Sequence, residues 1–197
     1  MGEKLAEAAL DTIFRVARTA NGYLDTPFTA ADAEAIWDLM KFGPTSANQM
    51  PARLIWCLSP ESRERLASHA SGTNAAKIVA APAAVVIGMD ENFHEHLPEL
   101  FPHTDARSWF EGNLPLRQVS AMRNATLQGA YFIIAARALG WDVGPMSGFN
   151  NASVDADFFA TTPSVKSNFI ATIGIADPAT IFPRSPRPAF AKFNRIA

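Results

Sequence analysis

The sequence predicts a single globular domain of the α+β or three-layer α/β class. The chain has 197 residues, of which 48% are hydrophobic and 18% charged, a composition that supports one substantial core. Several stretches repeat apolar residues at helical spacing, whereas three short runs are continuously apolar and rich in β-branched residues. We therefore expect roughly three to five strands among about six helices, with residues 1–197 forming one domain.

The first half of the chain alternates predicted helices with predicted strands. Apolar residues three and four positions apart predict amphipathic helices over about 5–17, 29–40 and 61–69. A first strand is predicted at 53–58. The run Ala83–Ile87 is apolar at every position, which is typical of a central strand buried on both faces.

The second half contains the longest predicted helix, over 120–139. It is crowded with alanine and glycine, so we expect another backbone to pack very close to it, and we propose it as a dimer core. Residues 168–175 predict another strand. Residues 91–117 are irregular and dense in His, Pro, Phe and Trp, and 97–117 within them is expected to form a lid-like insertion. The Pro/Arg tail at 178–197 is expected to pack on a partner subunit.

Composition argues against several classes of function. A net charge of −2 provides no electrostatic case for nucleic acid or an anionic membrane surface. The single Cys57 lies in an apolar run and is interpreted as a small core residue. His94 and His96 lack the further ligands of a metal site, so no metal is predicted. No signal-peptide pattern and no membrane-spanning run is present, and we expect a cytoplasmic protein.

Two glycine-containing loops could border a flat ligand. In Gly43-Pro-Thr-Ser-Ala-Asn48 the backbone is broken by Gly-Pro and followed by hydroxyls and an amide, which suits a heteroaromatic cofactor. Gly144-Pro-Met-Ser-Gly-Phe149 would let the backbone pass tightly against a planar ring. Each could equally be an ordinary connection between secondary-structure elements.

Three arginines could bind a phosphate. Arg18, with Thr19 and Asn21 nearby, follows the first helix, and its alternative role is to complement the helix dipole. Arg184 and Arg187 lie in the tail, whose prolines stiffen it into an arm. If the tail folds back, these side chains could converge with Arg18 on one phosphate.

The predicted lid supplies the candidate substrate residues. Arg107 would suit a substrate carboxylate, and His103 could supply a proton. The alternative is a surface or interface loop in which Arg107 forms a local ion pair with Asp105.

Five separated motifs together resemble the nitroreductase family of FMN flavoproteins. They are Arg18-Thr-Ala-Asn21, Gly43-Pro-Thr-Ser-Ala-Asn48, Ala81-Pro-Ala-Ala-Val-Val86, Gly144-Pro-Met-Ser-Gly-Phe149 and the Arg/Pro tail. The segments Phe101-Pro-His-Thr-Asp-Ala-Arg-Ser-Trp-Phe110 and Lys166-Ser-Asn168 more narrowly resemble the malonic semialdehyde reductases of pyrimidine degradation.

The resemblance implies an intertwined homodimer with a nitroreductase-like three-layer α+β fold, a central mixed sheet flanked by helices, and FMN bound at the subunit interface. It implies phosphate contacts from the arginines and contacts to the ring and ribityl chain from the two loops. The implied cofactor-binding residues are Arg18, Thr19, Ala20, Pro44, Thr45, Ser46, Asn48, Pro145, Met146, Ser147, Gly148, Arg184 and Arg187. Asn21-Gly22 stands where many members carry a further basic residue.

The predicted function is an FMN-dependent NAD(P)H oxidoreductase. We expect NADH or NADPH to reduce FMN in a ping-pong cycle, after which hydride passes to malonic semialdehyde and yields 3-hydroxypropionate. The alternatives are a broad nitroaromatic or quinone reductase, a flavin-binding module without turnover, and a cofactor-free structural dimer.

Overall fold

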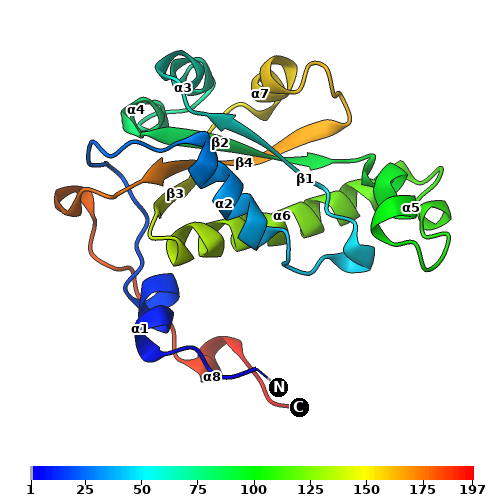
Figure 1. The fold of residues 1–197 in the computed structure, drawn as a ribbon, viewed down its shortest axis with the longest axis horizontal. Helices are drawn as coiled ribbons and strands as arrows, with labels where there is room; N and C mark the ends of the chain where they lie inside the picture. The colour runs from blue at the N-terminus through cyan, green and yellow to red at the C-terminus, as the bar shows by residue number, and fades with distance from the viewer. Residues whose placement is uncertain (1) are drawn as a thin grey trace.

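The computed structural model describes residues 2–197 and places one sheet between two layers of helices (Figure 1). Its strands are β1 (Ala52–Cys57), β2 (Ala83–Asp90), β3 (Asp142–Met146) and β4 (Val165–Gly174), arranged in the order β1-β2-β4-β3. All three neighbouring pairs are antiparallel. We expected a mixed sheet, but its four strands pair only in the antiparallel sense. Among residues 2–197 the one parallel contact is an isolated bridge between Thr19 and Val143.

The helices differ greatly in length. They are α1 (Glu7–Leu10), which continues as a π-helical turn over Asp11–Arg15, α2 (Ala30–Met40), α3 (Pro60–Ala67), α4 (Asn74–Ala80), α5 (Leu97–Leu100), α6 (Leu114–Ala138), α7 (Asn151–Phe158) and α8 (Phe190–Phe193). Short 3-10 turns cover Ser46–Asn48, Phe93–His96, Arg107–Trp109 and Pro178–Thr180.

Alternate residues of β2 supply the two halves of the core. Val85 and its alternate neighbours pack with the side chains of α2 and α6 on one face. Val86 and its alternate neighbours pack with α3, α4 and α7 on the other face. Both faces of β2 are covered by helices, which explains why its residues are apolar at successive positions. The predicted central strand is confirmed. The predicted three-layer α+β fold is confirmed with it.

Helix α6 begins at Leu114, earlier than the predicted residue 120. The Asn113 side chain accepts a hydrogen bond from the Leu116 amide at 3.1 Å, and Pro115 occupies the first turn, which are both helix-start features. We placed residues 91–117 in an irregular segment because its density of Pro and His concealed this start.

Several small residues of α6 face the sheet of their own chain, whereas Ala130 and Ala138 are exposed. Ala125 and Gly129 are buried, and a Cβ on Gly129 would lie 2.4 Å from the Phe169 ring on β4. The close approach at Gly129 is therefore an intrachain contact, and the dimer core on this helix stays a prediction. The opposite face of α6 instead exposes larger apolar side chains, namely Leu116, Val119, Met122 and Leu127.

Two further elements differ from the sequence-based expectation. Residues 142–146 form the edge strand β3, where we expected only a loop; an edge position tolerates Pro145, which cannot donate a backbone hydrogen bond. The first helical segment ends at Arg15, well short of Asn21, and none of the residues in α1 and its π-helical turn is buried.

Three observations bear on the classes of function considered above. No helix within residues 2–197 combines the length and apolarity needed to cross a bilayer. The same residues contain no cluster of three or more His, Cys, Asp or Glu side chains that could hold a metal ion. Cys57 is a core residue, and burial raises the pKa of its thiol to about 11.

Gly144→Ala should destabilise the fold, because a Cβ at this position on β3 would lie 2.6 Å from the backbone oxygen of Ala20 and 2.6 Å from Thr172 Oγ1. We expect a loss of about 1–3 kcal/mol in the free energy of unfolding, measured by urea denaturation. A variant that unfolds at the wild-type urea concentration would show that the first segment of the chain does not pack on β3 as described.

Candidate functional site

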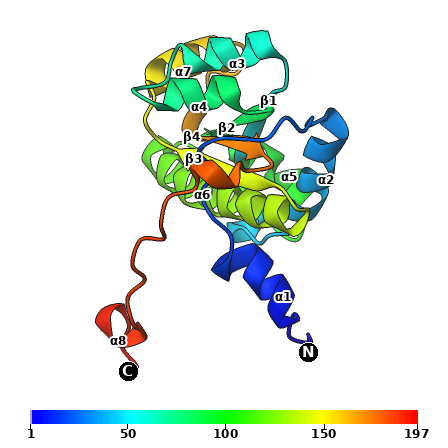
Figure 2. The same cartoon turned by 90° about the vertical axis from the view of Figure 1, so that its left-hand side faces the viewer.

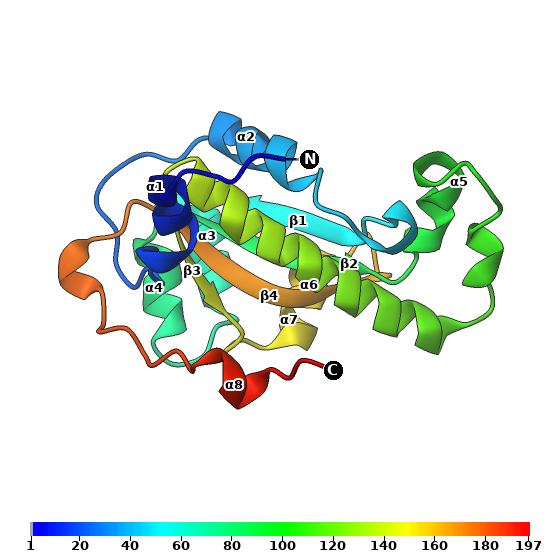
Figure 3. The same ribbon diagram turned by 90° about the horizontal axis from the view of Figure 1, so that it is seen from below.

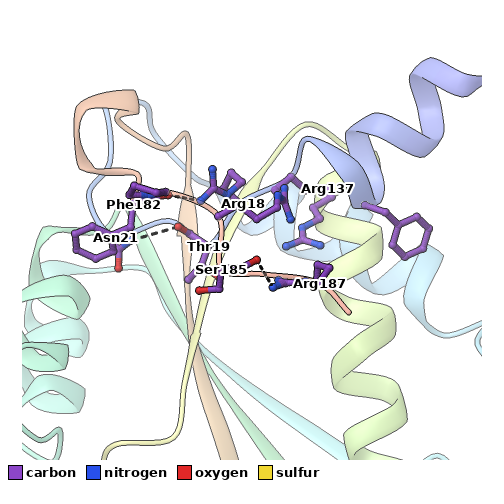
Figure 4. Close-up of a pocket in the computed structure, with 11 residues that line it drawn as sticks. Arg18, Thr19, Asn21, Arg137, Phe182, Ser185 and Arg187 are labelled. Carbon is purple, nitrogen blue, oxygen red and sulfur yellow. Dashed lines mark hydrogen bonds between the residues drawn. The ribbon is translucent and has the colours of Figure 1, made fainter. Parts of the chain in front are cut away.

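The two ends of the chain and the end of α6 enclose a cavity of about 340 Å³ (Figure 4). Arg18 and Thr19 come from the N-terminal segment, and Arg137 comes from the last turn of α6. The tail contributes Arg184 and Arg187. The structure therefore brings the predicted phosphate-binding arginines together and adds Arg137, which the sequence analysis did not single out.

Arginine–carbonyl hydrogen bonds hold the two chain ends against each other. Arg184 Nη2 donates to the carbonyls of Arg15 at 2.7 Å and Ala17 at 2.8 Å, and Arg18 Nη2 donates to the carbonyl of Phe182. Both ends project from the same side of the molecule, away from the sheet (Figure 2). The cavity lies where they leave the body of the domain.

The cavity has four cationic side chains and lacks carboxylate partners for them. Among residues 2–197, none of Arg18, Arg137, Arg184 and Arg187 forms an ion pair. Burial lowers the pKa of Arg137 from its ordinary value, Asp142 opposes that effect, and the positive charge of Arg184 adds to it. A dianion such as a phosphate monoester would relieve this repulsion, so the cavity fits a phosphate.

The residues after Arg18 lead from this cavity into the sheet. The Ala20 amide donates to the Val143 carbonyl at 3.2 Å, which fixes the segment on the edge strand β3. Asn21 Oδ1 accepts a hydrogen bond from Lys77 Nζ at 2.9 Å, so α4 supplies a cation beside the position where the sequence lacks a basic residue.

Arg137 and Lys77 could not have been distinguished from ordinary helix residues. A basic residue in the last turn of a helix complements the helix dipole in any fold, and Arg137 occupies such a position. Lys77 lies on α4, a helix that the sequence analysis did not predict. Only the tertiary arrangement shows that both face the segment carrying Arg18.

A second cavity of about 340 Å³ lies against the Pro145–Ser147 segment. Its wall is mostly apolar and comes from α6, β3 and β4: Thr126, Ala130, Ile133, Pro145, Met146, Ser147 and Phe169. The next residue, Gly148, has its carbonyl held by the amide of Ser71 at 2.9 Å and by Asn74 Nδ2 at 3.1 Å. A Cβ on Gly148 would lie 2.6 Å from Asn74 Nδ2, so a side chain here would displace Asn74 from its hydrogen bond.

The loop over Pro44–Asn48 is fixed to α6 and to the lid. Asn124 Oδ1 accepts from the Ser46 amide at 2.8 Å, and Tyr131 Oη donates to the Pro44 carbonyl at 2.8 Å. Asn48 Nδ2 donates to the Leu100 carbonyl at 2.8 Å and so links this loop to α5. Each bond joins residues far apart in the sequence, so the loop is held by tertiary contacts.

A buried polar network stabilises the unusual backbone of this loop. Ala47 and Asn48 have left-handed φ values of 49° and 48°. Directly after them, Gln49 Nε2 donates to the Ser46 carbonyl at 3.0 Å, and Ser120 Oγ donates to Gln49 Oε1 at 3.0 Å. Gln49 is fully buried, and these partners satisfy its polar atoms. Thr45 also takes part, accepting from the Met50 amide at 3.2 Å.

One chain does not bring the loop and the arginine cavity together. The two loop anchors on α6, Asn124 and Tyr131, lie roughly 20 Å and 9 Å from the cavity residue Arg137 along the helix, at about 1.5 Å per residue. Seen from below the sheet, the loop and α1 lie toward opposite ends of α6 (Figure 3).

The lid residues lie outside both cavities. Arg107 pairs with Glu95 at 2.8 Å and with Glu111 at 2.9 Å, instead of forming the pair with Asp105 that we considered. His103 is exposed, and its ring packs edge-on against Phe101 with 5.5 Å between ring centroids. The guanidinium of Arg107 is thus occupied by two carboxylates of its own chain.

The model of a family described as "Nitroreductase family" matches residues 15–174, from the arginine segment to the end of β4. The chain belongs to the nitroreductase family. The predicted family and fold are thereby confirmed. A relative from Burkholderia lata is 55% identical over 192 residues, 98% of each chain, and one from Xanthomonas oryzae is 53% identical over the whole of both chains. Both carry the provisional name NADH dehydrogenase/NAD(P)H nitroreductase.

Solved nitroreductase structures have the same fold at low sequence identity. A Bacillus subtilis protein assigned as a nitroreductase matches with a TM-score of 0.88 and 21% identity, covering 98% of this chain and all of its own. A protein from Exiguobacterium sibiricum, also assigned as a nitroreductase and crystallised in complex with FMN, matches with a TM-score of 0.82 and 16% identity over the full length of both chains.

An ionic cluster on α3 and α7 supports the segment that contains Gly148. Asp157 on α7 accepts hydrogen bonds from Arg65 Nε, shared between its two oxygens at 2.9 Å, and from Arg65 Nη2 at 2.5 Å, and it contacts His69 Nε2 at 2.8 Å. The His69 carbonyl accepts from the Asn150 amide at 2.9 Å, next to the Gly148 turn. Arg65 and then His69 lower the pKa of Asp157 to about 2.

Asp157→Asn should remove a pH-dependent part of the stability. Because the folded pKa of Asp157 is depressed to about 2, its contribution is complete above the unfolded value of about 4 and is lost as the pH falls from about 4 to 2. We expect the variant to be less stable at pH 6 and to have a flatter dependence of unfolding free energy on pH below 4. Identical pH profiles for variant and wild type would contradict the ion pairs described.

Proposed function

We propose that this chain is an FMN-dependent NAD(P)H oxidoreductase that acts as a homodimer. The observation that carries the proposal is the cavity of four unpaired arginines in a chain of the nitroreductase family. FMN in the Exiguobacterium neighbour and the names of the close relatives support the same cofactor and electron donor. When bound, FMN would supply the redox chemistry by accepting hydride from NAD(P)H and passing it on.

The predicted cofactor residues divide into three groups with distinct roles. Arg18, Thr19, Arg184 and Arg187 would bind the phosphate, and Ala20 would hold this segment against β3. The second group borders the apolar cavity and would contact one side of the ring: Pro145, Met146, Ser147 and Gly148. The third would approach the ring or the ribityl chain from the loop anchored on α6: Pro44, Thr45, Ser46 and Asn48.

A partner subunit would complete this site. Within one chain the loop is anchored on the middle of α6 and the arginine cavity lies at its end, and α6 exposes the apolar side chains of Leu116, Val119 and Met122. A second copy packed on this face would bury these side chains and could bring its loop to the cavity. The tail over 178–197, which leaves the domain with α8, would then pack on the partner.

Two classes of acceptor are proposed. The resemblance of residues 101–110 to malonic semialdehyde reductases supports a short oxo-acid whose carboxylate binds Arg107. The names of the relatives, the apolar wall around Phe169 and the two carboxylates already paired with Arg107 support a flat nitroaromatic or quinone. The second acceptor requires no charged partner on the protein.

The purified protein should be yellow and should release FMN on denaturation. Anaerobic NADH or NADPH should bleach the bound flavin absorbance, because the site would hold a redox-active cofactor accessible to the donor. Absorbance spectra before and after donor addition measure this. A colourless protein that takes up no added FMN would refute the proposed function, and bound flavin that no donor bleaches would indicate a binding module without turnover.

Arg107→Ala distinguishes the two acceptors. If Arg107 binds a substrate carboxylate, the variant should raise KM for malonic semialdehyde by about tenfold or more, because a charge-assisted bond contributes about 1.5–3 kcal/mol. Turnover of an uncharged quinone is the internal control and should not change. Arg107→Lys should retain part of the semialdehyde activity. Unchanged semialdehyde kinetics in Arg107→Ala would exclude the carboxylate role and favour the general reductase.

A further inference from the structure

Arg137 lies in the arginine cavity with most of its hydrogen-bonding capacity unused. It comes from the last turn of α6, and its Nη1 donates to the Ile13 carbonyl at 3.1 Å. Its Nε is buried and has no hydrogen-bond partner. Among residues 2–197, Nη2 also has no partner, although the side chain lines the cavity with Arg18 and Arg187 (Figure 4).

What sets Arg137 apart from a structural arginine is its place among other cations in the cavity, since Arg63 also has a buried Nε without a partner. An arginine that only complemented the dipole of α6 would bond the free carbonyls of its own last turn, whereas the hydrogen bond of Arg137 goes to Ile13 in the first helical segment. Burying a guanidinium among other cations costs stability unless an anion compensates it. Asp142 on β3 favours the charged form of Arg137, and the positive charge of Arg184 disfavours it.

The surrounding cations are held by neutral groups only. Arg18 donates to the carbonyl of Phe182, Arg184 to those of Arg15 and Ala17, and Arg187 to that of Ser185 at 3.0 Å. These carbonyls orient the guanidinium groups but leave their net charge in place. The cavity therefore has an excess of positive charge. Of its four arginines, Arg137 lies on α6, and the other three belong to the chain ends.

We infer that Arg137 is a fourth phosphate-binding residue, which anchors the phosphate of FMN to α6 while the other three arginines close on it from the chain ends. The inference rests on the proposed function, because it takes FMN as the ligand. It assigns a distinct part to Arg137: Arg18, Arg184 and Arg187 belong to segments that project from the domain, whereas Arg137 ends a helix packed on the sheet.

The test compares the affinities of Arg137→Gln for FMN and for riboflavin, which lacks the phosphate. Apoprotein is titrated with each flavin, and quenching of flavin fluorescence gives Kd. We expect the variant to bind FMN about tenfold more weakly or worse, the effect of losing one charge-assisted hydrogen bond, with riboflavin affinity changed less than about twofold. Added salt should weaken FMN binding less steeply in the variant, because one cation is missing.

Arg63→Gln is the matched control. Arg63 also donates through Nη1 to backbone carbonyls, those of Leu58 at 2.6 Å and Pro82 at 3.0 Å, and its Nε is likewise buried without a partner. It lies outside the arginine cavity, so its substitution should change neither affinity. Arg137→Lys, which keeps the charge, should lie between wild type and Arg137→Gln and serves if the glutamine variant does not fold.

Three outcomes would overturn the assignment of Arg137. They are wild-type FMN affinity in Arg137→Gln, an equal loss of FMN and riboflavin affinity, and an equal effect of Arg63→Gln on FMN binding. Wild-type protein that binds neither flavin would instead refute the proposed function itself. The two failures are therefore distinguishable in one set of titrations.

Discussion

The close packing of α6 on the sheet is the contact on which the rest of the molecule depends. Gly129 and the neighbouring alanines let the helix lie directly on β4, and the helix then extends along the whole length of the domain. Its middle anchors the loop before β1 through Asn124, and its last turn places Arg137 in the arginine cavity. Because the helix is rigid, the distance between these two sites is fixed.

Charge and backbone polarity are arranged differently at the two sites. In the cavity, guanidinium groups bond main-chain carbonyls and remain cationic, so the site attracts an anion. Beneath the loop, neutral amides and hydroxyls satisfy one another, and Gln49 and Asn124 hold a left-handed backbone without any net charge. The first arrangement suits a phosphate, and the second provides a rigid wall beside a neutral ring.

The sequence was sufficient for the fold class and for most of the arginines, because those predictions rest on local periodicity and on separated motifs. The continuous apolar run predicted the burial of β2, and the separated arginine motifs predicted that Arg18 and Arg184 lie together. Strand β3 was missed because glycine and proline are common in loops, and only an edge position in a sheet explains Pro145. Arg137 was missed because a basic residue at a helix end has a sufficient local explanation. The partners of Arg107, Glu95 and Glu111, depend on how the lid folds.

Pro145 has a consequence beyond its place beside the apolar cavity. The Val143 carbonyl accepts from Ala20 on the outer side of β3, and Pro145, two residues further along the edge strand, has its main-chain nitrogen on that same side. At the outer edge of the sheet, the N-terminal segment therefore covers Val143, and Pro145 has no N–H to donate. An extended segment from another molecule cannot add there as a fifth strand, so this edge is protected against edge-to-edge aggregation.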